Sequence, residues 1–307
     1  MLISKMYLLG TLLTDVGAFA YSSDEIYWFK DNDLTVEPQL IAKVKNIQNV
    51  LISPDNTFLI VFNTTGGVFK VSILFKCKPK KYVLAGKPNG ARIYMQSNKF
   101  GVTADIRGNV FGIDFENDLF WKLSCDSAES YYAVFPSVEE NCFLMQGVDG
   151  NDNTFMRKYR VIENDIQLIN SHQFGDVTLI EHKINFKYKE LVYFIECVDK
   201  IVGLYSYNEI TRKTEKHFTL AKWDDLWKIL ACYKSLNYSD EYNCFVITRS
   251  DKIQLFDING NCIKEVLIQN GFLDSGYSNA PYDAYILNDK LYINTVIGVY
   301  EESLDLV

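Results

Sequence analysis

The chain has 307 residues, of which 48% are hydrophobic and 14% aromatic, so a large core is available and the composition favours β-structure. Its formal net charge is −8, which argues against nucleic acid as a partner because phosphate binding needs a basic surface. No apolar run approaches the roughly 18 residues of a membrane-spanning helix, so we expect no membrane partner.

The N-terminal segment is apolar and has features of both a leader peptide and a β-strand. Residues 1–13 carry one basic residue, Lys5, and the Ala-Phe-Ala sequence at 18–20 is similar to a signal-peptidase site. Gly10 and Asp15 interrupt the apolar run, however, and one positive charge is weak for a leader. We therefore interpret the segment as a β-strand.

One unit recurs along the chain: an apolar strand, a polar turn, a second strand, a turn rich in Gly, Asp or Asn, and a third strand. It is clearest at 50–73, where Ser53-Pro54-Asp55-Asn56 forms the first turn and 63–67 the second. Pro and Asp at these positions are favourable turn residues. Close copies lie at 92–115 and 230–258, and weaker ones at 18–29, 142–159, 191–205 and 285–300.

The spacing of these units predicts the fold. Their third strands are expected to begin near residues 26, 68, 110, 155, 201, 253 and 298, at intervals close to the roughly 40–50 residues of propeller blades. We therefore predict an all-β chain, a seven-bladed β-propeller of four-stranded blades, with residues 1–307 as a single domain. The seventh blade lacks a fourth strand, and we expect the N-terminal strand at 6–9 to close it.

The unit resembles the repeat of WD-repeat β-propellers. Ser53-Pro54-Asp55-Asn56 matches the Ser-Pro-Asp-Gly turn of that family, and Ile113-Asp114 and Phe256-Asp257 stand where its Trp-Asp dipeptide would. The resemblance covers most of the chain as a pattern, although the literal Trp-Asp and Gly-His pairs are absent. It implies a rigid scaffold whose loops carry the function.

Residues 220–230 interrupt the β pattern. Apolar residues at 223, 226, 227 and 230 have the i, i+3, i+4, i+7 spacing of an amphipathic helix. We predict a short helix between the fifth and sixth blades. Its side chains Trp223 and Trp227 either pack on the propeller, which is the more common outcome, or are available to a partner.

Catalytic and metal-binding motifs are absent from the sequence. The three His are not at metal-ligand spacing. The seven Cys include no C-x-x-C pair, and we interpret them as residues of a protein in a reducing compartment. Residues 149–153 begin like a calcium loop, but Thr154 and Arg160 replace its Gly and Glu, so a polar hairpin loop fits better. We expect a cytoplasmic protein that is not an enzyme and has no cofactor.

We predict a non-catalytic propeller that binds a basic protein, since acidic and aromatic loops suit a cationic interface. One specific version is an inhibitor or immunity protein that neutralises a basic toxin, with a monomer as the default state. Candidate partner-binding residues are Glu139, Glu140, Asp149, Asp152, Trp223, Asp224, Asp225 and Trp227.

Two alternatives stay open at the level of sequence. Inner strands of a propeller bring Asp, Glu and Asn from different blades to a central channel without a local motif, so a metal-dependent hydrolase or lactonase is one alternative. A structural scaffold subunit of a larger complex is the other. A tightly bound divalent ion would favour the enzyme, and instability without a partner would favour the scaffold.

Overall fold

A computed structural model describes residues 2–4, 10–14, 16–53, 55–65, 67–73, 79–82, 92–95, 100–104, 109–117, 119–124, 130–151, 153–162, 165–174, 178–179, 185–222, 232–268, 281–295 and 298–304. The chain divides into two compact units. Unit 1 comprises Met1–Leu8 and Val177–Val307, and unit 2 comprises Leu9–Asp176. Within the described ranges nearly all regular structure is strand, as the composition predicted.

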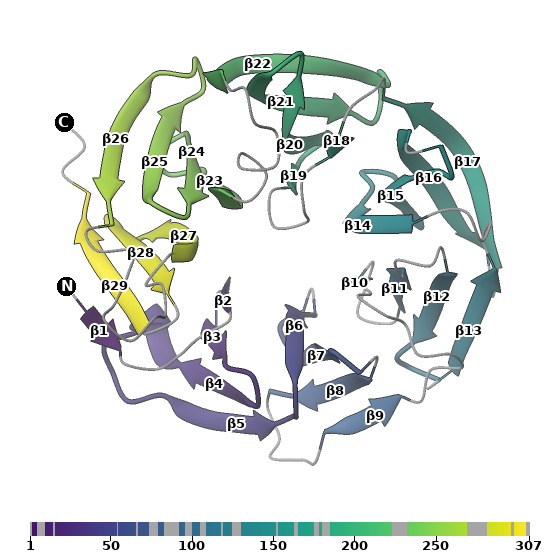
Figure 1. Cartoon of the computed structure of the whole chain (residues 1–307). Coiled ribbons are helices and arrows are strands. Elements are labelled where there is room, and N and C mark those ends of the chain that lie inside the picture. The colour runs from purple at the N-terminus through teal and green to yellow at the C-terminus, as the bar shows by residue number, and fades with distance from the viewer. Residues whose placement is uncertain are drawn as a thin grey trace. The chain divides into compact units, whose positions relative to one another are not determined.

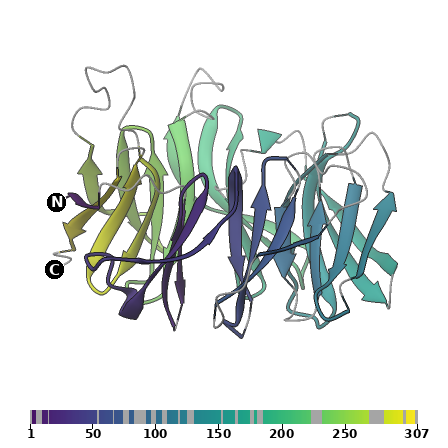
Figure 2. The same cartoon turned by 90° about the horizontal axis from the view of Figure 1, so that it is seen from below.

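The described residues of unit 2 form four sheets, each of four antiparallel strands that follow one another in chain order. In Figure 1 and Figure 2 the strands of each sheet lie side by side. The first sheet consists of β2 (Gly10–Thr14), β3 (Gly17–Tyr21), β4 (Glu25–Phe29) and β5 (Gln39–Lys43), with the 3₁₀ turn η1 (Lys30–Asn32) before β5. The others are β6 (Ile47–Ile52), β7 (Phe58–Asn63), β8 (Val68–Ser72) and β9 (Lys80–Tyr82); β10 (Arg92–Met95), β11 (Phe100–Ala104), β12 (Asn109–Asp114) and β13 (Leu119–Ser124); and β14 (Ser130–Pro136), β15 (Cys142–Val148), β16 (Thr154–Ile162) and β17 (Asp165–Gln173).

In unit 1 the described residues form three sheets. The first has the order β18-β20-β21-β22, with β19 also paired to β20, and the second has the order β23-β24-β25-β26. Their strands are β18 (Thr178–Leu179), β19 (Asn185–Tyr188), β20 (Leu191–Val198), β21 (Ile201–Asn208), β22 (Lys213–Lys222), β23 (Tyr233–Ser239), β24 (Cys244–Arg249), β25 (Lys252–Asp257) and β26 (Cys262–Leu267). The third sheet joins β27 (Pro281–Leu287), β28 (Lys290–Thr295) and β29 (Gly298–Ser303) to the N-terminal β1 (Leu2–Ser4).

The prediction of four-stranded sheets is wrong for the sheet that contains β20, which has five strands. β21 pairs with one edge of β20, so β18 and β19 must share the other edge. β19 pairs with residues 191–194 and β18 with residues 196–197 of β20. Two short strands therefore occupy the place of one strand, which the repeat pattern did not anticipate.

The N-terminal strand completes the last sheet, as predicted. Leu2 pairs with Tyr300 and Ser4 with Val299, so β1 covers the edge of β29 that would otherwise be open. The strand lies at Leu2–Ser4, whereas the sequence predicted it at 6–9, and residues 6–9 lie outside the described ranges. Both segments are apolar, and the pattern alone does not determine the register.

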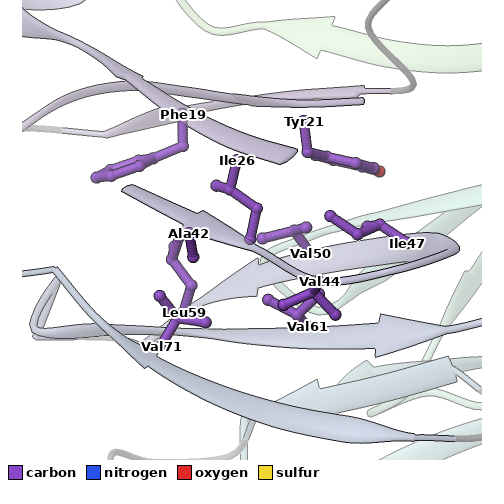
Figure 3. Packing of buried hydrophobic residues seen from close by; sticks show 10 residues of the cluster. All are labelled: Phe19, Tyr21, Ile26, Ala42, Val44, Ile47, Val50, Leu59, Val61 and Val71. Carbon is purple, nitrogen blue, oxygen red and sulfur yellow. The ribbon is translucent and has the colours of Figure 1, made fainter. Parts of the chain in front are cut away.

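Apolar side chains from the first two sheets of unit 2 form one continuous core (Figure 3). Phe19 and Ile26 of the first sheet face Leu59 and Val61 of the second, and all four are fully buried. Every residue of β7 is buried, because this strand has a neighbouring strand on each side and packs on both faces. Burial of one such side chain contributes roughly 1.5–3 kcal/mol, so packing between sheets is a main source of stability.

Ser53 organises the turn between β6 and β7 that matched the WD-repeat pattern. Its side chain is fully buried, and its Oγ accepts hydrogen bonds from the backbone N–H groups of Thr57 and Phe58, each at 3.0 Å. The Ser53 N–H donates to the Phe58 carbonyl at 2.9 Å. One hydroxyl thus accepts hydrogen bonds from two backbone N–H groups that the tight turn removes from the hydrogen bonding between the strands.

Replacing Ser53 with Ala should lower the free energy of unfolding by about 1–3 kcal/mol, because the buried Phe58 N–H loses the hydroxyl acceptor and the Thr57 N–H keeps only its bond to Asp55. Urea denaturation of the wild type and the variant measures this loss. Asp55→Asn is the matched control, since Asp55 also bonds to Thr57 but is exposed and should matter less. A Ser53→Ala variant as stable as Asp55→Asn would contradict this role of the hydroxyl.

Candidate functional site

Glu139, a predicted partner-binding residue, is engaged by its own sheet. It lies in the turn before β15, and its Oε1 is 2.6 Å from the Nζ of Lys158 on β16. The Lys158 side chain is 4% exposed, whereas that of Glu139 is 54% exposed. The hydrogen bond from Lys158 lowers the pKa of Glu139, and Arg160 lies 3.6 Å from its other oxygen. Glu139 therefore neutralises a buried lysine, while the adjacent Glu140 is exposed.

Asp149 builds a hairpin loop between β15 and β16. Its Oδ1 accepts the N–H groups of Asn151 and Asn153, each at 2.9 Å, and its Oδ2 accepts the Asn153 amide at 3.2 Å. These hydrogen bonds lower the pKa of Asp149. The same arrangement recurs at Asp257, which accepts from Asn259 and Asn261. The segment is the polar hairpin loop expected from the sequence.

The remaining predicted site residues, Asp152, Trp223, Asp224, Asp225 and Trp227, lie outside the described ranges. The helix predicted for 220–230 is wrong at its start, because residues 220–222 belong to β22, where Ala221 pairs with Val202 and Lys222 with Ile201. Strand pairing thus prevails over the helical spacing in these three residues. The rest of the predicted helix is outside the described part of the chain.

The structure brings together aromatic rings that sequence reasoning did not single out. Phe186 and Tyr188 lie two residues apart on β19 and therefore project from the same face. Tyr193 of β20 pairs with Phe186, and their rings stack at 5.0 Å with an interplanar angle of 9°. β23 lies beside β19 (Figure 1) and places the ring of Tyr238 5.1 Å from Tyr188 and 6.2 Å from Phe186.

Acidic side chains accompany these rings. Burial is the main cause that raises the pKa of Tyr193, and the negative charges of Glu190 and Glu215 raise it further. Asp240 acts in the same way on Tyr238. The tyrosine–acid patch is defined here as Phe186, Tyr188, Tyr193, Tyr238, Glu190, Glu215 and Asp240. Its tyrosines are half-buried, and Glu215 and Asp240 are exposed, so both rings and charges reach solvent.

A lysine of the chain already lies against the patch. The Nζ of Lys189 is 4.9 Å from the centroid of the Tyr188 ring. The Tyr188 hydroxyl is the main cause that raises the pKa of Lys189, and the charges of Asp240 and Glu190 add to it. Lys189 is exposed and adopts a φ of 53° in the turn between β19 and β20. The patch therefore favours a cation on the face of a ring.

A buried ion pair holds the backbone beneath the patch. The Nζ of Lys187 is 2.6 Å from Oε1 of Glu209, with side chains 6% and 0% exposed. The Glu209 N–H donates to the Glu190 carbonyl at 3.0 Å, which links the turn after β19 to the turn after β21. The latter turn presents Ile210, which is 66% exposed. The turn that carries Glu190 of the patch is thus tied to the turn after β21.

Comparison with known proteins is informative only at the level of structure. No protein-family model and no curated protein matches the chain. Among solved structures, BamB from Moraxella catarrhalis has a TM-score of 0.62 at 11% identity, over 98% of each chain. The WD40 beta propeller domain of Doa1 has a TM-score of 0.64 at 12% identity, over 97% of this chain and 94% of that one. The beta-propeller domain of Cps50 (Swd1) from Myceliophteria thermophila has 0.68 at 8% identity, over 97% of each.

The chain has a β-propeller fold. At these identities the likeness shows the fold alone, and it confirms the WD-repeat-like pattern read from the turns. In the described ranges no helix reaches the length and apolarity of a membrane span. No group of three His, Cys, Asp or Glu among the described residues is arranged to hold a metal ion.

Proposed function

We propose that this propeller is a non-catalytic binding protein that engages a basic protein through the tyrosine–acid patch. The observation that carries the proposal is the stacking of Phe186, Tyr193 and Tyr238 next to acidic groups at one end of two neighbouring sheets. Tyrosine is enriched among residues that dominate binding energy, and acidic groups steer cationic partners. The net charge of −8 favours the same class of partner.

Replacing both Tyr188 and Tyr238 with Ala should reduce partner affinity at least about 30-fold, the effect of losing a binding hot spot. The tagged chain is used to capture proteins from the lysate of its own organism at low and high salt, followed by mass spectrometry. The wild type is expected to retain one stoichiometric basic protein, released at high salt. Circular dichroism verifies that the variant is folded.

Glu140→Gln is the matched control, because Glu140 is exposed and acidic but lies outside the patch. It should capture the partner as the wild type does. Undiminished capture by the double tyrosine variant would refute the patch as the binding site. Failure of the wild type to capture any protein, together with a stoichiometric divalent metal in the purified chain, would favour the hydrolase alternative.

We propose that the seven described sheets are seven blades of one ring, and that residues 1–307 form a single domain in the cytoplasm. An inhibitor or immunity protein that neutralises a basic toxin is the narrower version of the function, supported by the acidic net charge. It predicts that the captured protein is toxic and that the propeller blocks its activity. A stable multisubunit assembly among the captured proteins would favour the scaffold alternative.

A further inference from the structure

Lys189 occupies a position that a cation of a partner would need. Its ammonium group lies over the ring of Tyr188, and Glu190 and Asp240 act on it electrostatically. The centroids of the Tyr188 and Tyr238 rings are 5.1 Å apart and the rings are tilted by 48°, so Tyr238 packs against Tyr188 next to the cation. Lys189 itself is exposed and belongs to a two-residue turn, and its side chain interacts with both the ring and the hydroxyl of Tyr188.

The chemistry of this tyrosine pair and its neighbouring negative charges suits arginine better than lysine. A guanidinium group is planar, stacks on aromatic faces and forms paired hydrogen bonds with carboxylates, whereas an ammonium group is a compact, strongly hydrated charge. Tyr188 offers an aromatic face that Tyr238 packs against, and Glu190 and Asp240 supply negative charge that acts on a cation at this face. A lysine at the Tyr188 ring therefore uses less of this site than an arginine would.

We propose that Tyr188, Tyr238, Glu190 and Asp240 form a recognition site for an arginine side chain of the partner, and that Lys189 is a resident stand-in that the arginine displaces. This inference rests on the proposed function, since it names the group that the patch recognises. Displacement moves only an exposed side chain, so binding needs no change in the backbone. Lys189 then acts as an internal competitor that lowers the affinity of the site.

The probe is a short peptide with one arginine, acetyl-Gly-Gly-Arg-Gly-Gly-amide, titrated into the full chain and followed by NMR. The same peptide with citrulline, which is neutral and nearly isosteric, is the ligand control. Lys189→Ala should bind the arginine peptide about 2- to 5-fold more tightly than the wild type, the range expected for an exposed ring–cation contact. Tyr188→Leu should lose binding, and the citrulline peptide should not bind.

Lys213→Ala separates displacement from a simple change in charge. Lys213 is exposed and pairs with Asn208 at the same end of the sheet, so its removal changes the net charge equally. It should leave the affinity nearly unchanged. Equal gains in the two lysine variants, an unchanged affinity in Lys189→Ala, or no binding of the arginine peptide at millimolar concentrations would overturn the proposal. Loss of partner capture in the double tyrosine variant alongside any of these results would leave the proposed function standing.

Discussion

Replacing Glu196 with Gln should stabilise the chain at alkaline pH and leave its stability nearly unchanged at pH 5. Glu196 lies on β20 and is 2% exposed, and its Oε1 has no hydrogen-bond partner in the described part of the chain. Burial raises its pKa from 4.5 to about 8. The side chain is therefore a neutral acid in the folded protein at neutral pH.

The direction of the pH effect follows from this shift. Between pH 4.5 and about 8 the folded chain holds a proton that the unfolded chain has released, so stability falls as the pH rises through this window. The loss reaches at most about 5 kcal/mol above pH 8. Gln cannot ionise, so the Glu196→Gln variant avoids this loss of stability. Urea denaturation at pH 5, 7 and 9 should show a difference between variant and wild type that grows with pH.

Glu265→Gln is the control for this prediction. Glu265 on β26 is 38% exposed at its side chain, and the hydrogen bond from Lys252 at 2.8 Å lowers its pKa. It is ionised in both folded and unfolded chains above pH 5, so its substitution should have a small effect that does not grow between pH 5 and 9. Parallel pH profiles for the wild type and Glu196→Gln would show that Glu196 does not titrate as expected.

The turns carried most of the information about the fold. Third strands were predicted to begin near residues 26, 68, 110, 155, 201, 253 and 298, and β4, β8, β12, β16, β21, β25 and β29 begin within one residue of these positions. The chemistry of a tight turn is local: Asp257, for example, bonds to residues two and four positions later. A local pattern of turn residues therefore fixes the hairpins and their spacing.

The candidate site depends on contacts that no local pattern encodes. Tyr188 and Tyr238 are 50 positions apart and meet only because β23 packs beside β19. The sequence contained a faint signal of this cluster. Phe186 and Tyr188 alternate along one segment, and the short Lys-Glu turn that follows leads into the segment with Tyr193. Conversely, Glu139 and Asp149 are acidic residues that the sequence offers for a partner. In the structure the Glu139 carboxylate pairs with Lys158, and the Asp149 carboxylate accepts hydrogen bonds from amides of its own loop. Charge can be read from sequence, whereas its partners cannot.

Replacing Lys187 with Met should destabilise the chain by about 3–5 kcal/mol, because the fully buried Glu209 carboxylate then loses its counter-charge. Urea denaturation at pH 7 measures the loss. The double variant Lys187→Met/Glu209→Leu removes both charges and replaces them with apolar groups, so it should recover most of the stability. If the single variant costs less than about 1 kcal/mol, which is the value of an exposed ion pair, the pair is not desolvated.

The same pair also bears on the patch, and the two effects can be separated. Glu209 links the turn after β21 to the Glu190 carbonyl, so loss of its partner should loosen the turn that carries Lys189 and Glu190. Amide hydrogen exchange at residues 189, 190 and 209 should therefore accelerate in Lys187→Met more than at β24. If β24 accelerates equally, the ion pair stabilises unit 1 as a whole; if the turns alone respond, it serves to position the tyrosine–acid patch.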